Sequence, residues 1–112
     1  MLLAALTLGV AAATADATVY YGALEGAQKP AVIVALKVFD RIPEYQEIKR
    51  RGLGPDDSDY WVLLAKANEK FYAAIRKAAE ARSYDVVVEA GTHTFEKEPP
   101  DATQAVIDSL EK

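Results

Sequence analysis

The feature that most constrains this sequence is the stretch from Asp57 to Val88, which reads as one long helix running into a short apolar strand. Within it, side chains recur at alternating spacings of three and four, which places them on one stripe of an α-helix. The stripe consists of Trp61, Leu64, Asn68, Phe71, Ile75, Ala78 and Arg82. A lone Asn in such a coiled-coil-like seam typically fixes register and oligomer number. Two interpretations stay open: the stripe faces the chain's own core, or it contacts another chain.

The first fifteen residues carry no charge and form an apolar run that turns into small residues. A run of this kind followed by Ala13-Thr14-Ala15 or Ala15-Asp16-Ala17 is typical of a secretory leader, although no Lys or Arg precedes it. It is also too short to span a bilayer stably, and the alternative is a buried N-terminal helix. We therefore expect a leader over residues 1–17, one domain over residues 18–112, a periplasmic or secreted location, and no integral membrane segment in the mature chain.

Charge and cysteine content exclude several functional classes. Removal of the leader takes Asp16 away and leaves 13 basic and 16 acidic side chains, a net charge of −3 (13 − 16). This mild acidity argues against nucleic acid as a partner. The absence of cysteine from the sequence excludes disulfides, thiol catalysis and cysteine-type zinc sites. The single histidine, His93, is weak support for metal binding or acid–base catalysis.

Two short strands and a helix are expected before the long helix. Thr18 to Tyr21 is β-branched and aromatic, and the run from Ala31 to Leu36 is apolar on both faces, so both faces should be covered. The two strands could form a hairpin, or the first could be a loosely held arm. The stretch from Lys37 to Gly52 predicts a helix after a short turn, with Pro43 at its first position and glycine as its stop. Its expected buried face consists of Val38, Ile42, Tyr45 and Ile48.

An acidic hinge and a polar tail complete the pattern. The hinge from Leu53 to Asp59 contains three Asp residues, but it lacks the later glycine and the bidentate Glu of a calcium loop. We interpret these acids as helix caps and first-turn residues. After the long helix, a strand is expected from Tyr84 through Val88 toward Phe95. A last helix, capped by Asp101, should then present an apolar face.

The order of strand, helix, hinge, helix, strand and helix predicts an α+β fold, a small β-body that carries an antiparallel helical hairpin. Two segments, Ala31 to Tyr45 and Ala78 to Gly91, resemble the periplasmic chaperone family of Skp, also called OmpH-like. In that family a strand leads into a long helical hairpin, which returns to a strand of the form Tyr-Asp-hydrophobic-Val-hydrophobic-Glu. A C-terminal helix then closes a trimeric β-body. The resemblance covers roughly residues 31–110.

The resemblance implies a non-enzymatic protein that binds unfolded envelope or outer-membrane proteins without a cofactor or metal. It also implies a homo-oligomer, a trimer in the family, assembled through the strands. Two departures matter: the longer arm of this hairpin would reach only about 40 Å, and the family's tentacled chaperones are strongly basic whereas this chain is acidic. A second hypothesis is therefore a small oligomeric envelope scaffold, or an interaction module, without holdase activity.

The expected functional residues are contact surfaces and include no catalytic, cofactor-binding or metal-binding residue. The candidate oligomer or client contacts are Trp61, Leu64, Asn68, Phe71 and Ile75. The candidate basic client surface consists of Lys66, Lys70, Arg76 and Lys77. A third hypothesis is an enzyme that uses Glu89 or Glu47 with His93. It is disfavoured because neither pair is spaced to share a helix or strand face and because no nucleophile motif accompanies them.

Overall fold

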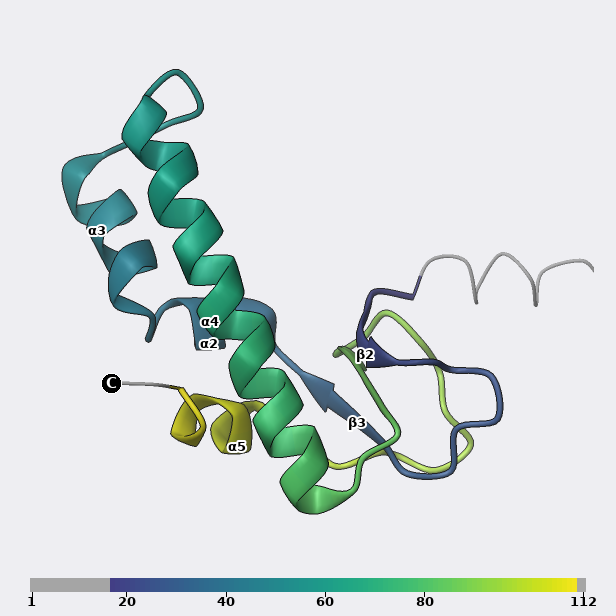
Figure 1. Ribbon diagram of the computed structural model, residues 1–112. Helices are drawn as coiled ribbons and strands as arrows, with labels where there is room; N and C mark the ends of the chain where they lie inside the picture. The colour runs from purple at the N-terminus through teal and green to yellow at the C-terminus, as the bar shows by residue number, and fades with distance from the viewer. Residues whose placement is uncertain (1–16, 111–112) are drawn as a thin grey trace, which may run out of the picture.

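The computed structural model describes residues 17–110, which form a small α+β fold with a three-stranded sheet and four helices (Figure 1). This confirms the expected α+β class, while residues 1–16 of the expected leader lie outside the described part. No helix within residues 17–110 is long and apolar enough to cross a membrane. In chain order the elements are β2 Val19–Gly22, β3 Pro30–Ile33, α2 Ala35–Phe39, α3 Pro43–Arg51, α4 Ser58–Arg82, β4 Val86–Glu89 and α5 Thr103–Asp108.

Strand β4 lies in the middle of the sheet, between β2 and β3. β2 runs antiparallel to it, with Val19 opposite Val88 and Gly22 opposite Val86, and β3 runs parallel to it from Pro30 opposite Val86. The two N-terminal strands therefore do not pair with each other, so the hairpin alternative is wrong, and β2 is held in the sheet by β4 and is not a loosely held arm. Val86, Val87 and Val88 of β4 are all buried, so both faces of this strand are covered, as its continuous apolar sequence suits.

The two outer edges of the sheet differ. On β3, the Val32 amide donates to the Pro100 carbonyl at 3.0 Å, and the Ala102 amide donates to the Val32 carbonyl at 2.7 Å. These bonds cover the β3 edge with the segment that precedes α5. The outer edge of β2 pairs with no other strand in residues 17–110. An unpaired edge of this kind can accept a further strand.

Strand β4 ends at Glu89, so the expected extension toward Phe95 is also wrong. Gly91 has a φ of +83°, a left-handed conformation that turns the chain out of the sheet. The segment after it forms turns and bends rather than strand. It lines a hollow together with Val32.

The hydrophobic core lies between the sheet and the helices and is centred on Phe71 of α4. Its ring stacks on Phe39 with 4.4 Å between centroids and meets Tyr20 edge-on at 5.3 Å. Ala31, Ile33 and Val87 of the sheet belong to the same core. Four small residues of α4, Ala67, Ala74, Ala78 and Ala79, are also buried in it. Small side chains at these positions allow close packing against the neighbouring elements.

The helix expected to begin at Pro43 is confirmed as α3, but the expected entry turn and the last residues of the strand expected from Ala31 to Leu36 form a separate short helix, α2, that does not continue into α3. Pro43 is the reason, because a proline disfavours helical geometry in the preceding residue, and Ile42 is extended with φ −95° and ψ 122°. Pro43 nevertheless opens α3, and Gly52, with a φ of 64°, ends it, as the sequence predicts. The expected buried face is largely confirmed: Val38, Ile42 and Ile48 are buried and Tyr45 is partly buried.

The stripe expected along α4 is not a single buried face. Phe71 and Ile75 are each 1% exposed, whereas Trp61 is 55% exposed and Asn68 is also exposed. Figure 1 shows the reason: the C-terminal half of α4 lies over the sheet, and its N-terminal half extends beyond the sheet beside α3. One side of the helix is buried or partly buried along most of its length, but it is wider in the C-terminal half, and Trp61 and Asn68 of the expected stripe fall outside it.

Gly22 gives a test of the close approach between the end of β2 and the start of β4. Gly22 and Gly26 have similar φ values of +72° and +77°, but a Cβ on Gly22 would collide with the Asp85 backbone carbonyl, whereas one on Gly26 meets open space. Gly26→Ala should lower the free energy of unfolding by about 1–2 kcal/mol, the cost of left-handed geometry. Gly22→Ala should cost at least ~1 kcal/mol more. Urea denaturation measures both, and equal losses would contradict the register of β2.

Candidate functional site

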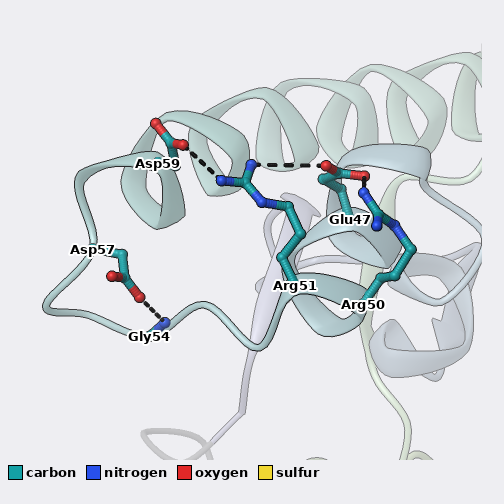
Figure 2. A network of polar contacts seen from close by, with 6 residues as sticks. All are labelled: Glu47, Arg50, Arg51, Gly54, Asp57 and Asp59. Carbon is teal, nitrogen blue, oxygen red and sulfur yellow. Dashed lines mark hydrogen bonds and ion pairs between the residues drawn. The ribbon is translucent and has the colours of Figure 1, made fainter.

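The end of the α3–α4 pair is held by ion pairs between the two helices (Figure 2). Arg51 contacts Asp59 at 2.9 Å, at the start of α4, and Glu47 of its own helix at 3.7 Å. Arg50 pairs with Glu47 at 2.6 Å. The pairing with Asp59 raises the pKa of Arg51. Exposed pairs of this kind add little stability, but here they fix how α4 begins relative to the end of α3.

The hinge between these helices is tied to itself. The Gly54 amide donates to Asp57 Oδ2 at 2.9 Å, and the Trp61 indole Nε1 donates to the Pro55 carbonyl at 2.8 Å. The expectation that the acids cap α4 is therefore wrong for Asp57. This residue stands at the N-cap position, but its carboxylate closes the hinge and makes no cap hydrogen bond. The hydrogen bond from its indole nitrogen to Pro55 attaches the Trp61 ring to the hinge.

Beside the hinge, α4 presents an apolar surface to solvent. Trp61 and Val62 are 55% and 54% exposed, and Ala65 follows them one turn later. Together with Lys66 and Glu69 they line an open hollow of about 500 Å³. We call the exposed side of α4 that carries this hollow the outer face. Its residues are Ser58, Trp61, Val62, Ala65, Lys66, Glu69, Tyr72 and Arg76.

The structure does not bring the candidate contact residues together on one surface. Trp61 and Asn68 are exposed, Leu64 is partly buried, and Phe71 and Ile75 lie in the core of the chain. The candidate set did not include two large apolar residues of α4 that are exposed, Val62 and Tyr72. Tyr72 is 48% exposed although it neighbours Phe71 in sequence. Val62, Ala65 and Tyr72 also lie on one line with spacings of three and four residues, which could have indicated this second face. That line includes charged residues, so its apolar signal is weaker than that of the stripe through Phe71.

The four candidate basic residues also have different surroundings. Lys66, Arg76 and Lys77 are exposed. Lys70 is partly buried between α3 and α4, where its ammonium lies 3.0 Å from Glu44 Oε1. That oxygen is buried and has no hydrogen bond of good geometry, so Lys70 compensates its burial. Burial opposes the ionisation of Glu44, but the nearby Lys70 outweighs it, and the pKa of Glu44 is lowered. Lys70 therefore joins the two helices.

Glu89 and His93, two residues of the enzyme hypothesis, contact different neighbours and not each other. Glu89 Oε1 accepts a hydrogen bond from the Tyr20 hydroxyl at 2.8 Å and another from the Ala35 amide at 3.0 Å. This arrangement joins β2, β4 and the start of α2, and burial together with Glu89 raises the pKa of Tyr20. The ring of His93 instead packs edge-on against Phe95, with 4.7 Å between centroids. In the part of the chain that the structure describes, no group of three potential metal ligands lies together.

A second carboxylate, Asp85, holds the loop between β2 and β3. Its two oxygens accept the Gln28 amide at 2.6 Å and the Lys29 amide at 3.0 Å. These bonds, chiefly the one from Gln28, lower the pKa of Asp85. Lys29 Nζ also donates to the Arg82 carbonyl at 3.1 Å, near the end of α4. Among residues 17–110, Val19 and Leu36 are also exposed apolar residues, but the outer face of α4 is where Trp61 and Val62 lie next to each other in solvent.

Comparisons of the chain with protein families, with curated proteins and with solved structures find no significant match. A function has to be argued from the surface of the molecule itself.

The hydrogen bonds that Asp85 accepts from the Gln28 and Lys29 backbone amides predict a specific pH dependence of stability. Because the pKa of Asp85 is lowered in the folded state, its ionised form stabilises the fold above the ordinary Asp pKa of about 3.9, and this contribution is lost as the pH falls through the lowered value. Asp85→Asn should therefore reduce stability at neutral pH and flatten its decline toward acid. Urea denaturation from pH 7 to pH 2.5 measures this. The control is Asp56→Asn in the exposed hinge. If the free energy of unfolding of Asp85→Asn fell toward acid pH as steeply as that of the wild type, the stabilising role of the Asp85 carboxylate would be contradicted.

Proposed function

We propose that this protein is a non-enzymatic, OmpH-like binding module that holds unfolded envelope or outer-membrane polypeptides on the outer face of α4. The observation that carries the proposal is the exposed apolar hollow beside the hinge, where Trp61 and Val62 lie more than half in solvent. Exposed apolar patches in a folded domain mark interaction sites. The core is complete without these residues, so their exposure has no structural benefit.

The shape and chemistry of the hollow suit a polypeptide better than a small molecule. Small-molecule sites are concave and bring several polar groups to converge on the ligand. Here the hollow is open, and its two charged residues, Lys66 and Glu69, have opposite signs. Such a surface can accept apolar side chains of many sequences and either sign of neighbouring charge. Trp61 adds a large contact whose orientation is already set by its hydrogen bond to Pro55.

Association of several copies would strengthen weak binding of this kind. We propose that copies associate through the outer edge of β2, which pairs with no other strand among residues 17–110. Several outer faces held in one assembly raise the effective concentration of binding sites around one long client. A periplasmic or secreted location is part of the same proposal, supported by the leader-like composition of residues 1–17.

The alternative is a small oligomeric envelope scaffold without holdase activity, and the length of α4 favours it. The helix has 25 residues, which corresponds to about 37 Å. An arm of this length offers a surface to a client segment but does not enclose a large client. In the scaffold hypothesis the same outer face would bind one folded partner.

Val62 provides the test. The wild-type protein should delay the aggregation of a urea-unfolded outer-membrane protein after dilution, followed by light scattering. Val62→Glu should weaken client binding by about 1.5–3 kcal/mol, the value of one buried Val, and so raise the half-protective concentration tenfold or more. The matched control is Leu36→Glu, which places the same charge at an apolar residue of α2 that is 65% exposed.

The outcomes separate the two hypotheses. No delay by the wild-type protein would remove the holdase proposal and leave the scaffold. A delay that both variants lose equally would show that clients bind elsewhere than the outer face.

A further inference from the structure

The outer face of α4 has a symmetric spacing that client binding does not require. Ser58, Val62, Ala65, Glu69, Tyr72 and Arg76 are all exposed, and the steps between them are four, three, four, three and four residues. This is the spacing of a coiled-coil seam. The steps read the same from either end, so the line of residues is symmetric about Ala67. Ala67 itself is fully buried on the opposite side of the helix.

We propose that two copies of this protein pair through their outer faces, with the two α4 helices antiparallel. The two-fold axis crosses the outer face at the level of Ala67. The numbers of any two residues that face each other across the axis then add to 134. Val62 of each copy lies opposite Tyr72 of the other, Ala65 lies opposite Glu69, and Ser58 lies opposite Arg76. Every residue of the line meets another residue of the line, as an interface between identical surfaces requires.

The shapes of the facing residues are complementary. The hollow lined by Trp61, Val62 and Ala65 is open and mainly apolar. Tyr72 packs edge-on beside Tyr20 and Phe71 of its own chain and leaves 48% of its surface in solvent. In the antiparallel arrangement the exposed part of Tyr72 in each copy lies against the hollow of the other. Two Tyr72 side chains would thus cover two hollows that are open to solvent in the single chain.

The charges select a second copy in the antiparallel orientation. Glu69 of one helix faces Ala65 of the other, so it lies next to Lys66 of that helix, and this pairing occurs twice by symmetry. A parallel pair would instead set Glu69 against Glu69 near the middle of the seam and Arg76 against Arg76 at its end, and like charges repel. Antiparallel helices also oppose their macrodipoles. The charge pattern therefore favours the antiparallel pair.

This pairing does not depend on the proposed function, but it has a consequence for it. Trp61 and Val62 would be covered in the pair and free in the single chain, so a client and a second copy compete for one surface. The seam spans about two and a half heptads, which makes a small interface and a readily reversible association. Self-pairing would thus protect the apolar hollow until a client displaces the second copy.

Concentration dependence of the mass is the first test. Sedimentation velocity of the purified protein should show a reversible association that Tyr72→Glu weakens at least tenfold, because it places a carboxylate in the apolar hollow. Leu36→Glu makes the same chemical change outside α4 and should leave the association unchanged. A wild-type protein whose mass is independent of concentration, or equal effects of both variants, would overturn the proposal. Circular dichroism confirms that each variant is folded.

Disulfide trapping tests the orientation, separately from any association through the strands. Because the sequence has no cysteine, each single-cysteine variant carries one thiol. Ser58→Cys mixed with Arg76→Cys in a glutathione buffer should give the mixed disulfide. Either variant alone should give little, since its two thiols would lie about 27 Å apart, 18 residues (76 − 58) at 1.5 Å each. Ser58→Cys with Lys77→Cys, off the line, is the control. Predominant trapping of either variant with itself would overturn the antiparallel pair.

Discussion

The packing of Phe71 is the interaction on which the rest of this structure depends. Its ring lies between Phe39 of α2 and Tyr20 of β2, and only 1% of the residue is exposed. One side chain thereby attaches the long helix to the sheet and to the segment that precedes α3. Burial of a side chain of this size contributes about 1.5–3 kcal/mol, a large part of the stability of a small domain. Because the contact lies midway along α4, it also sets which part of the helix covers the sheet.

That attachment explains why α4 has an exposed apolar face. On its inner side, the part of α4 C-terminal to Phe71 packs against the sheet and α5, and the small side chains of Ala74, Ala78 and Ala79 fit this close packing. Residues N-terminal to it have α3 on one side only. The other side stays in solvent although it carries Trp61 and Val62. The geometry of the core and the proposed binding surface are thus two results of one placement of the helix.

The hinge makes this surface specific in shape. Trp61 is bonded to Pro55, Asp57 to Gly54, and Arg51 to Asp59. These contacts orient the first turn of α4 before any partner binds, which lowers the entropy lost on binding. A surface that is apolar, preformed and symmetric in its spacing suits both of the uses we propose, the holding of client segments and the pairing of two copies.

The sequence by itself determined the local structure wherever the signal was local. Pro43 and Gly52 bound α3 because they act through their own backbone geometry, and the seven-residue periodicity located α4. The α+β class followed from the order of the elements. The central place of β4, the separation of β2 from β3 and the exposure of Trp61 and Asn68 were decided only by the tertiary structure. The physical reason is that periodicity shows which residues share a face, whereas burial depends on which element lies opposite that face. For α4 the opposite element changes from α3 to the sheet along the helix, and no local pattern contains that change.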